Sequence, residues 1–348
     1  MLFLGCTALA VGTTSQTALA ERLFPEITPA RAQAQSPAAG LEFEWRNQLL
    51  LKTNSSDLPE FERRTPTVVS GLRGFARTSL TNRLFAQTQN YLAGIYQEET
   101  ETAEGGPPNN ATQLFGGYGS SSSFALQTEN QNEVLAGIDV KGETEQQISR
   151  DNAGLKSETT TDSFFLWRPV FGFSKKSDSW AAGAFYSMGS EQEIKVKTRV
   201  LDDNREESTI AAIPPKFGGF FEAKIGTTMK LGAELDFILG SSNSPKLGDR
   251  TVYDDSYRIE SHLQFEYGET ESLWFSFTHE TLSYSDQDFV TFDSIPVTDL
   301  EVTYTFPSGY YIGTIATYSE DKQSTEEINR TFQVIGISLR TGLKLPMK

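Results

Sequence analysis

The stretch from residue 216 to residue 284 constrains the fold most, because apolar and polar residues alternate through four strand-length segments. The first two segments, 217–225 and 229–239, are joined by the turn 226–228. Closing that turn predicts three apolar pairs across the hairpin: Ile225 with Met229, Ala223 with Leu231, and Phe221 with Ala233. Because each apolar residue meets an apolar partner on the same face, the hairpin has a defined register.

A second hairpin follows, with strands 257–267 and 273–280 around the turn 268–272. Pairing Leu263 with Phe277 across this turn places His262 opposite Thr278. These strands exceed the ~5–6 residues usual in soluble sheets and match the about 9–11 residues that cross a bilayer. Length, one apolar face and one charged face together predict an all-β fold, a transmembrane antiparallel β-barrel.

The polar faces of the two hairpins define the candidate lumen. The predicted lumen-facing residues are Glu222, Lys224, Lys230, Glu234, Asp236, Arg258, Glu260, His262, Gln264 and Glu266. Both signs of charge occur, so opposite charges can pair across neighbouring strands. We therefore expect a lumen largely filled by such pairs or by a plug, with a small or gated conduit.

Composition excludes several other classes of protein. The chain has 348 residues, a net charge of −16 and a pI near 4.7, which argues against binding nucleic acid or anionic lipid. Beyond residue 20 no run of ~18 apolar residues occurs, so no spanning helix is expected. A mean hydropathy of −0.38 is still compatible with a barrel, whose lumen and loops are polar.

The amino terminus is typical of a secretory signal. Residues 1–20 contain an apolar core, 2–11, and a small-residue cleavage site at 18–20, with a second candidate site at 32–34. The single cysteine, Cys6, lies inside this segment, so the cleaved chain would have no disulfides. We expect residues 21–85 to form a leader, a plug or the first strands, and residues 86–348 to form the barrel.

The connections between segments alternate in length over the second half of the chain. Short turns at 174–179, 226–228, 268–272 and 307–309 alternate with longer polar stretches at 201–207, 241–256, 285–297 and 320–329. Outer-membrane barrels have short periplasmic turns and longer outer loops, and the count gives about 12–14 strands. Pro169 predicts a strand end or a bulge inside the segment 165–173.

Catalysis and metal binding are not expected. The two histidines, His262 and His279, fall on opposite faces of the second hairpin and cannot share one site. A lumen residue is the simpler interpretation of His262, and zinc-ligand spacing is absent. We therefore expect no enzyme activity, no metal and no cofactor.

Two stretches resemble a known family. The segments Phe164–Phe173 and Trp180–Ala184, and the run Ile213–Gly219 leading to Leu231–Asp236, resemble the FadL family of outer-membrane transporters of long-chain fatty acids and aromatic hydrocarbons. The resemblance implies a β-barrel that passes hydrophobic solutes. The family's Asn-Pro-Ala motif near the mature amino terminus is absent here, so its ligand-binding residues are not carried over.

These observations predict a monomeric barrel in the bacterial outer membrane, with membrane lipid and a hydrophobic small molecule as partners and no nucleic acid. The most favoured role is passage of small or hydrophobic solutes. The alternatives are a non-transporting surface barrel with adhesive or structural outer loops and, third, a soluble secreted β-protein that binds a ligand.

Overall fold

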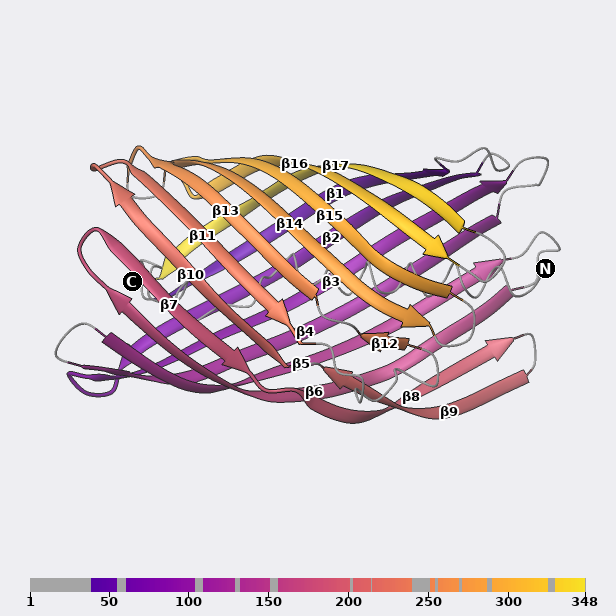
Figure 1. Cartoon of the computed structure of the whole chain (residues 1–348), viewed down its shortest axis with the longest axis horizontal. Coiled ribbons are helices and arrows are strands. Elements are labelled where there is room, and N and C mark those ends of the chain that lie inside the picture. The colour runs from indigo at the N-terminus through magenta and orange to yellow at the C-terminus, as the bar shows by residue number, and fades with distance from the viewer. Residues whose placement is uncertain are drawn as a thin grey trace.

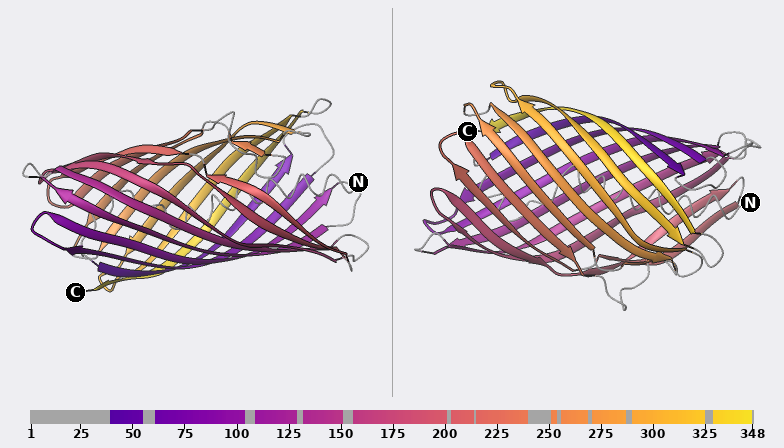
Figure 2. Two further views of the ribbon diagram at one scale, coloured as in Figure 1. Left: turned by 90° about the horizontal axis from the view of Figure 1, so that it is seen from below. Right: turned by 45° about the horizontal axis from the view of Figure 1, so that its top comes forward.

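The computed structural model describes residues 39–54, 61–103, 109–128, 132–150, 156–200, 203–213, 215–239, 251–253, 256–268, 271–286, 290–324 and 329–347. These residues form one antiparallel sheet that closes into a barrel with strongly tilted strands (Figure 1). Figure 2 shows the same wall from two further sides. Helices long and apolar enough to span a membrane are not found in the described part of the chain.

The first strands are β1 (Ala39–Asn54), β2 (Phe61–Ser79), β3 (Leu84–Ala103), β4 (Asn109–Gln127), β5 (Asn132–Arg150) and β6 (Lys156–Lys176). The middle of the chain forms β7 (Trp180–Ser187), β8 (Ser190–Val200), β9 (Asp203–Ile213), β10 (Lys216–Ile225), β11 (Met229–Ile238), β12 (Thr251–Tyr253) and β13 (Ser256–Glu266). The last strands are β14 (Ser272–Asp286), β15 (Val290–Thr305), β16 (Tyr310–Ser324) and β17 (Asn329–Met347).

These segments make fourteen barrel strands, in agreement with the predicted 12–14. β7 and β8 both pair with β6 in one continuous register, so together they form one barrel strand. β9 pairs with β8 and β10 pairs with β7, again in one register, so β9 and β10 form the next barrel strand. β12 precedes β13 along β14. The barrel closes where β1 pairs with β17, from Ala39 opposite Met347 to Asn54 opposite Phe332.

The two faces of the wall have opposite chemistry, as the alternation predicts. Large apolar side chains such as Trp45, Trp167 and Phe221 are exposed, whereas charged neighbours such as Glu44 and Asp236 are buried. Because the inner face of a closed barrel is the sheltered one, the polar residues line the lumen and the apolar residues form the outer surface.

The register of the first predicted hairpin is confirmed. β10 and β11 pair Ile225 with Met229 and Ala223 with Leu231 around the turn 226–228. Gly226 adopts a positive φ of 66°, a conformation that glycine reaches at little cost.

The predicted register of the second hairpin is wrong by two residues. Leu263 pairs with Phe275 rather than Phe277, and His262 lies opposite Ser276 rather than Thr278. The pairing extends toward the turn, where the Tyr267 backbone N–H donates to the Glu271 carbonyl oxygen at 3.0 Å. A shift of two leaves every side chain on its own face, so the alternation alone cannot detect it.

The barrel begins earlier than residue 86. Of the alternatives considered for residues 21–85, the described part forms strands: β1, β2 and the first two residues of β3. Residues 1–38 lie outside the described residues, so the signal peptide and any leader remain predictions.

Several strands extend into stretches predicted to be loops. β9 begins at Asp203, so the predicted loop 201–207 is largely strand, and β15 and β16 likewise reach into polar stretches. Pro169 does not end its strand, because β6 continues through it and pairs it with Ile138. On its other edge the pairing with β7 stops at Val170, as expected for a residue without an N–H.

Candidate functional site

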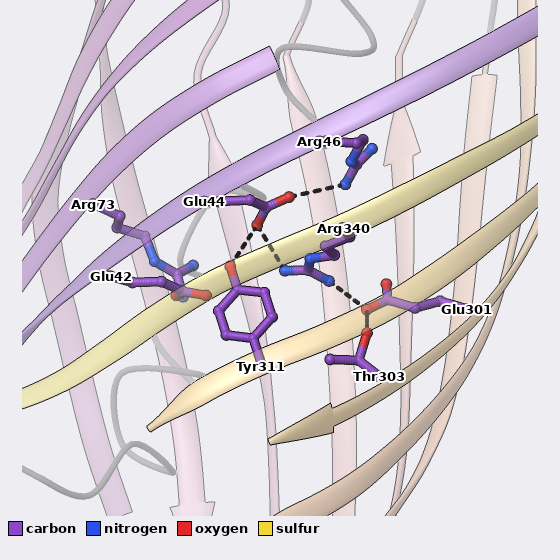
Figure 3. A network of polar contacts seen from close by, with 8 residues as sticks. All are labelled: Glu42, Glu44, Arg46, Arg73, Glu301, Thr303, Tyr311 and Arg340. Atoms are coloured by element: carbon purple, nitrogen blue, oxygen red, sulfur yellow. Dashed lines mark hydrogen bonds and ion pairs between the residues drawn. The ribbon is translucent and has the colours of Figure 1, made fainter. Parts of the chain in front are cut away.

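A network of polar side chains lies on the inner face where the first and last strands meet (Figure 3). We call it the seam array. Its members are Glu42, Glu44 and Arg46 on β1, Arg73 on β2, Glu301 and Thr303 on β15, Tyr311 on β16, and Arg340 on β17. The named acidic residues and arginines are equal in number, so their formal charges balance.

Glu44 is the centre of the seam array and is only 2% exposed. One carboxylate oxygen accepts from Arg340 Nη2 at 2.8 Å and from the Tyr311 hydroxyl at 3.1 Å, and the other accepts from Arg46 Nη2 at 3.3 Å. The other terminal nitrogen of the Arg340 guanidinium, Nη1, donates to the Glu301 carboxylate, which also accepts from the Thr303 hydroxyl at 2.7 Å. A single guanidinium therefore joins two carboxylates on strands from opposite ends of the chain.

Local sequence explains this arrangement. Alternation along β1 places Glu42, Glu44 and Arg46 on one face. Gly342 of β17 lies opposite Glu44, and a Cβ there would lie 2.4 Å from the Tyr311 hydroxyl. Glycine at this position therefore makes room for the tyrosine ring to lie over the backbone.

A second set of charges lines β10, β11, β13 and β14, where the sequence predicted the lumen. We call it the hairpin array: Lys216, Glu222, Lys230, Asp236, Arg258, Glu260, His262, Glu266 and Trp274. Its ion pairs join Lys216 to Asp236 at 2.9 Å, Arg258 to Glu260 at 2.7 Å, and Lys230 to Glu266 at 2.7 Å. Arg258 also approaches Asp236 at 3.9 Å.

His262 lies flat against the wall within the hairpin array. Its ring stacks on Trp274 with centroids 4.3 Å apart, and Nε2 lies 4.0 Å from the Glu222 carboxylate. Gly232 permits this position, because a Cβ there would lie 2.3 Å from the imidazole. His279 lies on the outer face, where Nδ1 is 2.9 Å from the Thr298 hydroxyl. The two histidines are thus on opposite faces, as expected.

The remaining predicted lumen residues occupy the same inner face at different depths. Glu234 is 7% exposed and pairs in register with Glu260. Lys224 is exposed beside the turn 226–228, and Gln264 lies opposite Trp274.

An apolar patch interrupts the charged lining on β2 and β3. Val69 lies opposite Ile95, and Gly71 lies opposite Ala93, all on the inner face. Val69, Ala93 and Ile95 are each at most 5% exposed. Among the described residues the inner wall therefore combines paired charges with uncharged stretches, of which Val69, Ala93 and Ile95 form one and the pair Ala125 and Leu135 another.

The seam array was missed by sequence reasoning. Its signal is visible in the alternation of Glu42, Glu44 and Arg46 with apolar residues. What the sequence does not reveal is the partner, because Arg340 is 296 residues from Glu44. Only closure of the barrel brings the two together.

No protein-family profile matches the sequence, and no curated protein matches it. Solved structures do match. The toluene transporter TodX of Pseudomonas putida aligns over 92% of this chain and 93% of its own, with a TM-score of 0.55 and 10% identity. A FadL homologue of Pseudomonas aeruginosa aligns over 89% and 90%, with a TM-score of 0.53 and 10% identity. The chain therefore has the fold of the FadL-type transporter barrels, as the resemblance of its sequence predicted.

Proposed function

We propose that this protein is an outer-membrane barrel through which small hydrophobic solutes pass. The likeness to a toluene transporter over more than nine-tenths of both chains carries the proposal. The exposed apolar outer face supports a place in the bilayer.

The chemistry of the lumen favours hydrophobic over hydrated solutes. Within each array the charged side chains form ion pairs with one another, so a hydrated ion would have to compete with partners already in place. The inner patch of Val69, Ala93 and Ile95 is an uncharged stretch of the same wall. Because these side chains are at most 5% exposed, a small aromatic or aliphatic molecule would reach them only when the covering side chains move, and it would then meet no charge.

Uptake into proteoliposomes tests the proposal. Labelled toluene should enter faster than a sugar of similar mass, and Ile95→Glu should slow toluene severalfold by placing a charge on the apolar patch. Gln97→Glu is the matched control, because Gln97 is also inward and buried on β3 but lies beyond the patch. Equal entry of sugar and toluene, unchanged by Ile95→Glu, would contradict the proposed selectivity.

Conductance in planar bilayers provides a second test. A lumen filled by paired charges should show little steady conductance, and the double change Arg258→Gln with Glu260→Gln should raise it by removing one pair at 2.7 Å. A large open conductance from the unchanged protein would identify a general porin instead.

Location is tested by fractionation. The protein should be recovered with outer membranes and should migrate differently on gels before and after boiling, because a closed barrel leaves no unpaired edge. Recovery in the soluble periplasm with identical migration would exclude the proposed location. The alternative, an adhesive or structural role for the outer loops, is less favoured because the similar solved structures include a toluene transporter.

A further inference from the structure

The outer face of β2, β3 and β4 carries a polar patch in a wall whose outward residues are mostly apolar. Two rows of the sheet form it: Gly74, Asn90 and Ser120 in one, and Ala76, Thr88 and Ser122 in the next. None of the six is a large apolar residue. We call them the outer polar patch.

The outer polar patch lies within the apolar band, not at its edge. On one side the adjacent row contains Leu72, Leu92 and Tyr118, which are 46%, 59% and 44% exposed. On the other side lie Phe124 and Leu126, which are 59% and 52% exposed. Along β4 large apolar side chains therefore bracket the patch in both directions, whereas β2 and β3 continue with Thr78 and Ala86. The bracketing on β4 places the patch at the depth of the hydrocarbon.

Among the described residues, the polar groups of the patch have few hydrogen-bond partners at that depth. The Thr88 and Ser122 hydroxyls are 3.0 Å apart and can satisfy one another in part. Asn90 is exposed, and within the described part of the chain its side-chain amide has no hydrogen-bond partner. Hydrocarbon offers neither donors nor acceptors, so an amide facing lipid is unfavourable.

We propose that the outer polar patch is a self-association surface, on which a second copy of this chain docks side by side in the membrane. Ala76 leaves room for a close approach of two walls, as small residues do at other membrane interfaces. At Gly74 the neighbouring Leu41 side chain lies 3.2 Å from the position of a Cβ, so this position is partly covered. The expected monomer would leave these polar groups facing lipid.

The chemistry of the patch favours a second copy over another partner. An amide and three hydroxyls each donate and accept, so the patch complements itself and presents no charge for a charged partner to recognise. Two copies in one membrane share one orientation. A two-fold axis along the membrane normal then brings each patch against its equivalent.

Disulfide cross-linking tests the proposal in vesicles, with the mature chain or with Cys6→Ser. Asn90→Cys should give a covalent dimer under mild oxidation. Ile259→Cys is the control, because Ile259 is outward and 41% exposed on β13, at the opposite side of the barrel. Ser120→Cys replaces Asn90→Cys if the latter does not fold, as judged by heat-modifiable migration.

Association in nanodiscs or detergent gives the second measurement. The unchanged protein should contain dimers by mass photometry, and Asn90→Leu with Ser120→Ala should shift the population toward monomers while the barrel stays heat-modifiable. A purely monomeric unchanged protein, or equal cross-linking from Asn90→Cys and Ile259→Cys, would overturn the proposal. Cross-linking in native membranes to a different protein alone would overturn the second copy as occupant. None of these outcomes depends on the solute, so they test the surface separately from transport.

Discussion

The seam array and the hairpin array have the same sequence origin but different architectures. Both arise from charged residues at every second position of a strand. In the seam array, Arg340 bridges carboxylates on β1 and β15, and Glu44 accepts from three residues. In the hairpin array, Lys216, Asp236, Arg258 and Glu260 follow one another in a chain of contacts, and Lys230 pairs with Glu266. These contacts lie within β13 or join β10, β11 and β13, which are close in sequence.

The difference shows that an alternating charged strand has no fixed role. Where its partners come from the other end of the chain, the ion pairs can contribute to closing the barrel. Where its partners lie on adjacent hairpins, closure does not depend on them, and the charges set the properties of the lumen. We therefore expect changes in the seam array to affect stability more than equivalent changes in the hairpin array.

The largest expected effect is that of Arg340→Leu. Removing this side chain leaves the Glu44 and Glu301 carboxylates without their shared guanidinium, and breaking a buried pair typically costs about 3–5 kcal/mol. Urea unfolding in lipid vesicles should show a corresponding loss in the free energy of unfolding.

Arg258→Leu is the matched change in the hairpin array, because the two arginines are similarly sheltered, at 18% and 21% side-chain exposure. Asp236 keeps its contact with Lys216 at 2.9 Å. The loss should therefore be clearly smaller than for Arg340→Leu. Equal losses would mean that the seam has no special part in stability.

Two glycine-to-alanine changes, one in each array, test the same comparison with a smaller expected loss of stability. In Gly342→Ala the new Cβ would lie 2.2 Å from the Phe43 carbonyl oxygen, which is backbone and cannot turn away. In Gly232→Ala it would meet the His262 ring, a side chain that can rotate. We expect about 1–3 kcal/mol of destabilisation at Gly342, the range typical of overpacking, and less at Gly232. Thermal unfolding that ranks the two variants in the opposite order would contradict the rigid seam.

How far the sequence predicts this molecule differs from one pair of strands to another. The fold class, a range of 12–14 strands that includes the observed fourteen, and the register of β10 with β11 follow from alternation and from a tight turn at Gly226. The register of β13 with β14 does not, because a shift of two preserves both faces and only the turn geometry decides.

The seam array marks the other limit. Glu44 and Arg46 are recognisable as one polar face, yet Tyr311 and Arg340 become their partners only through pairing of β1 with β17. The long polar ends of β9, β15 and β16 were also hidden, because strands rich in charged and small polar residues have the composition of loops. Local pattern thus defines faces, whereas contacts distant in sequence require the closed barrel.

The smallest expected effect belongs to Lys230→Met. Lys230 and Glu266 are 2.7 Å apart but 24% and 27% exposed, and such part-exposed pairs contribute at most about 1 kcal/mol. Water and salt reach this pair, so 1 M NaCl, with a Debye length of about 3 Å, should abolish the difference between variant and unchanged protein. Glu42→Gln provides the contrast, since Glu42 pairs with Arg73 at 6% exposure and its loss should persist in high salt. The measurement is urea unfolding at low and high salt. If Lys230→Met were as costly as Glu42→Gln and equally insensitive to salt, the difference in burial would not separate the two arrays. Both arrays would then have to be counted as structural.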